Sequence, residues 1–245
     1  MFFRKKNAKA NIADYSVLHA DLHSHLLPGI DDGSPDIETS IQLISGMKKL
    51  GYKKLITTPH IMWDVYKNTN SIILEKLELV RGRLADEQID VEIHAAAEYF
   101  IDEHLGELVE RKEPLLSFGN NLVLVEFSMV SQPFEWKNTL FEMQIQGYQP
   151  VIAHPERYAY LDRNKNFYDE LKGAGYLFQL NILSLSGQYG SSVAELARYL
   201  GKKGYYDLIG TDLHHARHLQ TLKNPSVFSS IQHVLDSGKI LNPTL

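Results

Sequence analysis

Histidines and carboxylates recur in this chain directly after runs of apolar, strand-like residues. Four short segments share this arrangement: His23-Ser24-His25, Thr58-Pro59-His60, Ala153-His154-Pro155 and Thr211-Asp212-Leu213-His214. Imidazole and carboxylate groups are common protein ligands of divalent transition metals, and ligands placed at several strand ends can converge on one site. The pattern predicts a polynuclear metal site and, with it, a metal-dependent hydrolase.

Strand-like and helix-like segments alternate from about residue 17 to the C-terminal region. The periodicity predicts strands over residues 17–23, 54–58, 91–96, 122–126, 150–153, 176–180 and 207–210. It predicts helices over residues 34–50, 71–87, 135–146, 166–173 and 192–201, with Ser34-Pro35 as a start and Leu50-Gly51 and Gln146-Gly147 as stops. Seven such βα units indicate a parallel α/β barrel, whose chemistry gathers at the C-terminal strand ends.

Candidate ligands stand at six of the seven predicted strand ends. In chain order they are His23 with His25, His60, Glu98, Glu126, His154, and Asp212 with His214. In an extended segment residues i and i+2 point to one side, so each of the two pairs can face one ion. The remaining strand ends at Gln179-Leu180-Asn181, which is polar but not ionisable. The joint pattern, rather than a single His-x-His pair, carries the prediction.

Several other ionisable residues are expected to be structural. His19 and Asp21 share a face with His23 if the first strand is regular, and we expect them in the core or behind the ligands rather than on a metal. His94, His104 and His233 are expected to find partners within a strand or a helix. For His215 and His218, structural and substrate-loop roles compete evenly.

Composition limits the class of protein. The chain has 245 residues, 44% of them hydrophobic, and its motifs show no internal boundary, so one large domain is expected over residues 19–245 after an N-terminal extension, 1–18. A net charge of -5 argues against nucleic-acid binding. The chain has no cysteine, which excludes disulfides and thiolate phosphatase chemistry and favours a cytoplasmic location. The basic start Phe2-Phe3-Arg4-Lys5-Lys6 lacks a following apolar run, so we expect a frayed tail and neither signal peptide nor membrane span.

Taken together, the motifs resemble the polymerase-and-histidinol-phosphatase (PHP) superfamily, and within it the bacterial protein-tyrosine phosphatases of capsule and exopolysaccharide operons. The segments that carry this resemblance are His23-Ser24-His25, Asp31-Asp32-Gly33, Thr58-Pro59-His60, Glu98, Glu126-Phe127-Ser128, His154-Pro155-Glu156-Arg157-Tyr158 and Thr211-Asp212-Leu213-His214. The two segments Asp-Asp-Gly and His-Pro-Glu-Arg-Tyr narrow the choice, because His-x-His is shared with amidohydrolases.

The resemblance implies a distorted seven-stranded, TIM-like (β/α)7 barrel of PHP type that holds three divalent metal ions, with manganese favoured and iron or zinc as the other options. Carried over by motif, the three sets of ligands are His23, His25, Glu98 and Asp212; Glu98, Glu126 and His154; and Asp32, His60 and His214. Glu98 would bridge two ions, and Asp32 is chosen over Asp31 because it precedes the glycine. Arg157 matches the phosphate-binding arginine of the family.

The implied reaction is hydrolysis of phosphotyrosine by metal-activated hydroxide, with the C-terminal tail of a bacterial tyrosine kinase of polysaccharide export as the expected partner. Metal coordination lowers the pKa of water, and Arg157 offers a fork of donors to phosphate oxygens. Either His214 or a metal-bound water would supply the proton to the leaving group. Two alternatives stay open: a small-molecule phosphatase, such as one for histidinol phosphate, and a non-catalytic phosphotyrosine-binding module. The aromatic segment 61–66 would either flank a substrate ring or pack internally.

Overall fold

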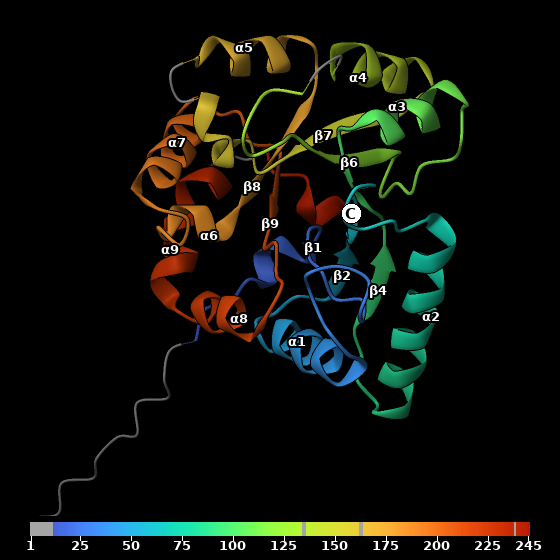
Figure 1. Ribbon diagram of the computed structural model, residues 1–245. Coiled ribbons are helices and arrows are strands. Elements are labelled where there is room, and N and C mark those ends of the chain that lie inside the picture. Colours follow the sequence, from blue (N-terminus) through green and yellow to red (C-terminus); the bar gives the residue numbers. More distant parts are fainter. Residues whose placement is uncertain (1–11, 134–135, 162–163, 238) are drawn as a thin grey trace, which may run out of the picture.

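The computed structural model describes residues 12–133, 136–161, 164–237 and 239–245, and Figure 1 shows its strands surrounded by helices. The predicted basic tail and the predicted helix start at residue 135 lie outside the described residues. Within these residues the strands are β1 (Ala20–Asp21), β2 (Lys54–Thr57), β3 (His60–Ile61), β4 (Glu92–Ala95), β5 (Glu98–Phe100), β6 (Leu122–Glu126), β7 (Gln149–Ala153), β8 (Leu177–Asn181) and β9 (Leu208–Gly210).

These strands pair in parallel to form a distorted barrel. Six strands follow the order β3-β5-β6-β7-β8-β9, and three follow the order β1-β2-β4. β2 pairs with β4, and β3 pairs with β5 in the same register. β2 and β3 are therefore two segments of one barrel strand, and β4 and β5 are two segments of the next. Pro59, which has no N–H to donate, lies at the interruption between β2 and β3. Counted in this way, the described part of the chain contains seven barrel strands, which confirms the predicted α/β barrel.

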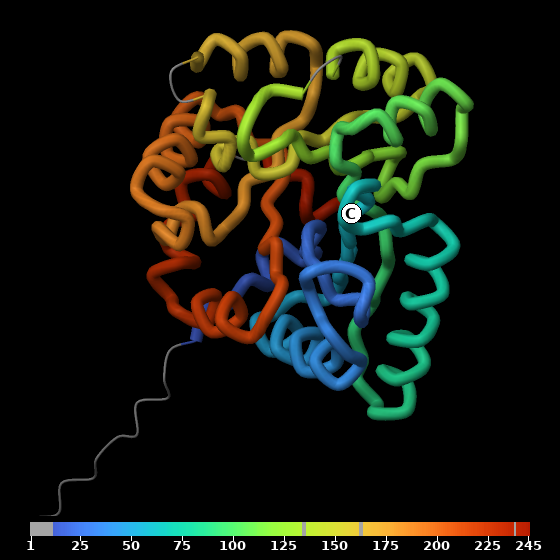
Figure 2. The backbone as a smooth tube through the Cα atoms, in the orientation of Figure 1, coloured from blue at the N-terminus to red at the C-terminus, as the bar shows by residue number. Residues whose placement is uncertain are grey.

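The barrel closes where the chain after β9 meets the chain after β1. The backbone N–H of Asp212 donates to the carbonyl of His23 at 2.7 Å, and that of His25 donates to Leu213 at 2.9 Å. At the opposite end, the buried Asn242 side chain donates to the carbonyls of Ala20 at 3.0 Å and Ile209 at 2.7 Å. The red C-terminal segment therefore lies beside the blue β1 in Figure 2. These bonds join β1 and β9, the first and last strands, at both ends of the barrel.

Helices cover the outside of the barrel. Those of the described residues are α1 (Ile37–Lys49), α2 (Asn70–Asp86), α3 (Glu103–Glu110), α4 (Trp136–Ile145), α5 (Asn166–Gly173), α6 (Ile182–Leu185), α7 (Ser191–Lys202), α8 (Ala216–Leu222) and α9 (Pro225–Leu235). The predicted helices correspond to α1, α2, α4, α5 and α7. The predicted cap at Ser34 is wrong: Asp36 caps α1, and its carboxylate accepts a hydrogen bond from the N–H of Thr39 at 2.8 Å.

The first predicted strand is too long at both ends. Ser16–Leu18 form a single 3-10 turn, and the strand itself covers Ala20–Asp21. His19 adopts a φ of 59° and is exposed, so its predicted place in the core is wrong. Tyr15 explains the turn: its buried ring stacks on Tyr52, and its hydroxyl donates to the carbonyl of Leu222. Ala13, Tyr15 and Leu18 are buried, so this segment packs against the barrel through these side chains.

Candidate metal centre

Alternation along the strands explains why polar groups gather at one end of the barrel. In β6, Leu122 and Leu124 belong to the apolar cluster at the barrel centre, whereas Val123 and Val125 pack on the outer side with the helices. The next inward position is Glu126, at the carboxyl end of the strand. The barrel therefore has an apolar interior below a ring of ionisable side chains.

The same two-residue step positions other candidate ligands. Ala96 lies in the central apolar cluster, and Glu98 is the next residue on that face. Leu208 also belongs to the cluster, and Asp212 follows it by two such steps. Asp212 has a positive φ of 50°, which marks the point where the chain leaves the strand direction.

Gln179 on β8 orients two of the histidines. Its Oε1 lies 2.9 Å from His23 Nδ1 and accepts a hydrogen bond from the backbone N–H of His154 at 3.2 Å. Gly210 lets these groups approach, because a Cβ there would lie 2.6 Å from His23 Cβ and 2.7 Å from Gln179 Nε2. The sequence marked Gln179 only as polar; its contact with two candidate ligands depends on barrel closure.

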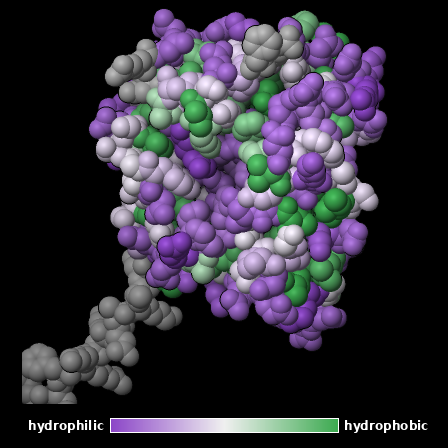
Figure 3. Space-filling model, in the orientation of Figure 1, coloured by the Kyte–Doolittle hydropathy of each residue, from purple (hydrophilic) through white to green (hydrophobic). Residues whose placement is uncertain are grey.

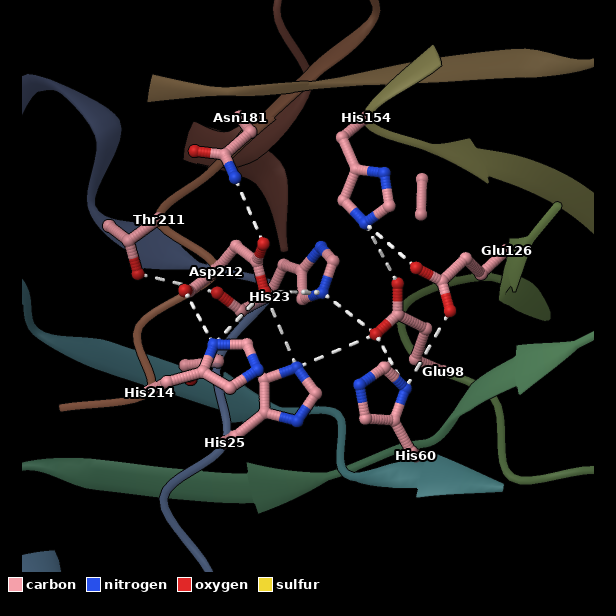
Figure 4. Close-up of polar contacts among 12 residues, drawn as sticks. His23, His25, His60, Glu98, Glu126, His154, Asn181, Thr211, Asp212 and His214 are labelled. Atoms are coloured by element: carbon pink, nitrogen blue, oxygen red, sulfur yellow. Dashed lines mark hydrogen bonds and ion pairs between the residues drawn. The ribbon is translucent and has the colours of Figure 1, made fainter. Parts of the chain in front are cut away.

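Glu98 lies at the centre of the cluster in Figure 4. Its Oε2 is 3.2 Å from His23 Nε2, 3.5 Å from His25 Nε2 and 3.2 Å from His60 Nδ1, and its Oε1 is 3.2 Å from His154 Nε2. Ligand atoms at about 2.0–2.2 Å from a shared ion lie roughly 3–3.5 Å from one another. The spacing around Glu98 therefore suits side chains that share ions.

Four overlapping groups of side chains each offer ligand atoms within 4.8 Å of one another. They are His25, Asp32, His60 and His214; His23, His154 and Asp212; His23, His25 and Glu98; and His60, Glu98 and Glu126. All nine predicted ligands lie in these groups, but the groups differ from the predicted sets. His25 joins Asp32, His60 and His214; His60 also joins Glu98 and Glu126; and His154 joins His23 and Asp212.

Buried polar atoms without hydrogen-bond partners test whether this cluster suits metal ions. In the described residues these atoms include His23 Nε2, His25 Nε2, His60 Nδ1 and both carboxylate oxygens of Glu98. Such atoms are costly unless they find a partner, and a divalent cation supplies one for all of them. The donor set, imidazole nitrogens with carboxylate oxygens, suits manganese, iron or zinc.

Asp31 and Asp32 have different surroundings. Asp31 Oδ2 lies 2.7 Å from His25 Nδ1, and its Oδ1 accepts from the N–H of Gly33 at 3.0 Å. Asp32 Oδ1 instead faces His60 Nε2 at 3.6 Å and His214 Nε2 at 3.4 Å. The arrangement thus has Asp31 orienting a histidine and Asp32 facing the cluster.

We expect Gly33→Ala to damage this corner of the site. A Cβ at Gly33 would lie 2.2 Å from the His25 carbonyl oxygen and 2.4 Å from His25 Cβ, so the loop must shift. The expected cost is about 1–3 kcal/mol of unfolding free energy together with reduced metal affinity. Urea unfolding and metal titration measure both. Gly82→Ala on α2 is the matched control, because its Cβ meets no atom within 4 Å and helix propensity favours alanine by about 1 kcal/mol; equal behaviour of the two variants would contradict the argument.

The buried ionisable groups of the cluster shift one another's pKa. Burial and the charge of Arg157 lower the pKa of His154 to about 4, which keeps its imidazole neutral, the form that binds metal. Burial and the charge of Glu98 raise the pKa of Glu126. For Glu98 burial acts in the same direction, but the neighbouring His23 and His60 outweigh it and hold the pKa well below its usual range.

A cavity of about 290 Å³ opens over the cluster, and Figure 3 shows a mostly hydrophilic hollow near the middle of this face. Arg157 lines it, with Nη1 donating to Asp212 Oδ2 at 2.7 Å. Half-buried apolar and aromatic side chains form the rest of the wall: Met62, Tyr66, Phe100 and Met129. The cavity thus combines ligand-type groups and a guanidinium with a partly apolar wall. Of the aromatic segment 61–66, Tyr66 lines the cavity, whereas Trp63 stacks on His104 outside it.

Most of the other expected structural residues behave as predicted. Asp21 is buried and accepts hydrogen bonds from the backbone N–H and the hydroxyl of Thr211. His94 pairs with Glu92 as expected. His215, for which two roles were left open, caps α8 by accepting from the N–H of His218. Phe100 and Met129 were missed, because no motif marks them and only their place at strand ends connects them with the cavity.

Comparison with known proteins gives a family match over most of the chain. Residues 19–235 match the family described as "Capsular polysaccharide synthesis, CpsB/CapC". Tyrosine-protein phosphatase YwqE of Bacillus subtilis (strain 168) is 27% identical over 197 residues, 80% of this chain and 78% of YwqE. Tyrosine-protein phosphatase CpsB of Streptococcus pneumoniae is 27% identical over 199 residues, 79% of this chain and 82% of CpsB.

Solved structures agree with this match. The crystal structures of YwqE and CpsB, described as unique metal-dependent tyrosine phosphatases, include a chain that aligns with a TM-score of 0.79 at 26% identity, covering 92% of this chain and 90% of that one. Histidinol phosphate phosphatase from Lactococcus lactis, solved with zinc, L-histidinol and phosphate, aligns with a TM-score of 0.57 at 13% identity over 94% of each chain. The second likeness concerns the fold alone. Among the described residues, no helix has the length and apolar character needed to cross a membrane.

Proposed function

Because the chain belongs to the CpsB/CapC family of capsular polysaccharide synthesis, we propose that it is a metal-dependent protein-tyrosine phosphatase. The observation that carries the proposal is the cavity, where groups suited to metal ions lie beside Arg157 and an apolar wall. Its relatives YwqE and CpsB are tyrosine-protein phosphatases. The phosphate of a substrate would meet the polar floor, and its aromatic ring would meet the wall.

The proposed ligands are His23, His25, Asp32, His60, Glu98, Glu126, His154, Asp212 and His214. We propose three divalent ions, with manganese as the favoured metal. When bound, such ions activate water for attack on phosphorus and offset the charge of phosphoryl transfer.

Arg157 is proposed to bind the transferred phosphoryl group. Its side chain is 23% exposed and lines the cavity, so its remaining N–H groups can reach a ligand there. A guanidinium matches two phosphate oxygens at once, which fixes orientation as well as charge.

His214 has two proposed roles that exclude each other. Its Nδ1 lies 2.9 Å from the carbonyl oxygen of Asp212, and its Nε2 faces Asp32 at 3.4 Å. A metal ion on Nε2 would leave neither nitrogen free to give a proton to the leaving group. Tyrosinate, whose phenol has a pKa of about 10, leaves without strong acid assistance, so ligation is the role we favour.

The rim of the cavity favours a protein substrate over a small metabolite. The two loops that supply Met62, Tyr66 and Met129 also carry Val65 and Val130, which are 61% and 84% exposed. A protein substrate would cover these exposed apolar side chains, whereas a metabolite held within the cavity would leave them in water. We propose the phosphorylated tail of a bacterial tyrosine kinase as the partner and the cytoplasm as the location.

Phosphate release tests the proposal. Purified protein with added manganese is expected to hydrolyse a tyrosine-phosphorylated peptide at least about tenfold faster, in kcat/KM, than histidinol phosphate, and a chelator should abolish both reactions. The apolar wall is the physical reason, since it matches an aryl ester. Preference for histidinol phosphate would contradict the proposal and indicate a small-molecule phosphatase. Release from neither substrate, with metal bound, would favour the non-catalytic binding module.

A further inference from the structure

Tyr189 contacts the arginine of the cavity but does not line the cavity itself. It belongs to the loop between α6 and α7, where Gly187 and Gly190 adopt positive φ angles of 81° and 96°. The guanidinium carbon of Arg157 lies 4.5 Å from the centroid of the Tyr189 ring. Cations over aromatic rings at this distance are attracted to the ring face.

Arg157 is thereby held by two contacts of different geometry. Asp212 Oδ2 accepts a hydrogen bond from Nη1 at 2.7 Å, which fixes one edge of the guanidinium, while the Tyr189 ring supports its carbon centre. A free arginine side chain has about 2 kcal/mol of rotamer entropy to lose on ordering. A guanidinium that is already ordered loses less of it when a phosphate binds.

Tyr189 also reaches the acceptor of Arg157 through Asn181. The Nδ2 of buried Asn181 donates to Asp212 Oδ2 at 2.9 Å, and it also lies 3.3 Å from the Tyr189 hydroxyl. Arg157, Asp212, Asn181 and Tyr189 thus form a closed ring of contacts. Displacing the tyrosine removes support from the arginine and from the side chain that holds its carboxylate partner.

We propose that Tyr189 is a positioning residue for phosphate recognition: its ring holds the Arg157 guanidinium in the orientation that receives phosphate oxygens. The inference rests on the proposed phosphatase function. It gives Tyr189, a loop residue that belongs to none of the motifs, the role of ordering the phosphate-binding Arg157. The aromatic face provides this support, and the hydroxyl is secondary.

Three variants distinguish the effect of the aromatic ring from the effect of the hydroxyl and from general destabilisation. Tyr189→Leu removes the aromatic face, and Tyr189→Phe keeps it. Tyr199→Leu is the matched control, because Tyr199 on α7 also has a cation over its ring, Lys165 Nζ at 4.8 Å, and does not line the cavity. Calorimetric titration of the manganese-loaded protein with inorganic phosphate gives the affinity, and steady-state assays on a phosphotyrosine peptide give KM and kcat.

For Tyr189→Leu we expect phosphate affinity to fall and KM to rise by about 5- to 10-fold, with kcat changed less than about threefold. Tyr189→Phe and Tyr199→Leu should stay within about twofold of the parent. In an Arg157→Ala background, Tyr189→Leu should have no further effect on phosphate affinity, because the group that it positions is gone.

Two results would overturn the inference: an equal loss of affinity for Tyr189→Leu with and without Arg157, or equal losses for the leucine and phenylalanine variants. Thermal unfolding identifies a variant that merely folds poorly, and the phenylalanine variant then still reports on the ring. If the parent protein binds phosphate but hydrolyses no ester, the proposed function fails while the calorimetry still decides the role of Tyr189.

Discussion

Glu98→Gln is expected to lower kcat by about 1,000-fold or more, which corresponds to about 4 kcal/mol of transition-state stabilisation. Glutamine preserves the size of the side chain but removes the charge that faces four histidines at 3.2 to 3.5 Å. Glu98 belongs to two of the four groups of ligand atoms, so the loss of its charge would weaken metal binding in both. The variant should therefore lose bound metal as well as turnover, which elemental analysis after gel filtration and phosphate release from a phosphotyrosine peptide measure.

Glu92→Gln is the matched control for this change. Glu92 lies on β4, the strand segment that β5 with Glu98 continues. Its side chain is about half exposed and pairs with Lys54 at 3.1 Å, away from the cavity. An exposed ion pair of this kind contributes about 0–1 kcal/mol, so metal content and kcat should match the parent. A Glu98→Gln protein that keeps both its full metal content and near-normal kcat would rule out the proposed centre.

The parts of the fold that were predicted well are those where local pattern and tertiary burial agree. The strand over 122–126 and the helix over 166–173 have the predicted bounds. The strand is a continuous apolar run that is buried on both faces, and the apolar positions of the helix coincide with its buried face. The strand pattern also accounts for the gathering of the candidate ligands at one end of the barrel. A strand that alternates inward and outward residues must present its last inward side chain at the barrel end.

Other features depend on contacts between residues far apart in the sequence. His19 continues the alternation of a strand, yet its backbone turns because Tyr15 stacks on Tyr52 and donates to the carbonyl of Leu222. Helix α3 was not predicted, although it begins at a visible signal, with Asp102 accepting from the N–H of Leu105. It follows β5, which lies beyond the predicted strand over 91–96. No sequence motif marks Tyr189, because its partner Arg157 lies 32 residues earlier in the sequence and contacts it only in the folded chain.

Removal of metal is expected to destabilise the fold. The buried cluster contains polar atoms of His23, His25, His60 and Glu98 that have no hydrogen-bond partner among the described residues. Ions bound by these atoms in the native state, and not by the unfolded chain, raise the unfolding free energy by about 2.7 kcal/mol per site at a hundredfold excess over Kd. In a chain of this size about 1 kcal/mol shifts Tm by roughly 2–4 °C, so even one site should raise it by at least about 5 °C.

Thermal unfolding followed by circular dichroism, with the chelated protein compared with the manganese-loaded protein, measures this shift. Glu98→Gln serves here as the internal control: its chelated form should unfold near the chelated parent, or above it, because one buried charge has been removed, and manganese should restore little stability. The difference between the two metal-induced shifts then isolates the stabilisation that passes through the carboxylate of Glu98. Equal shifts in the parent and the variant would place the stabilising metal elsewhere and contradict the centre built around Glu98.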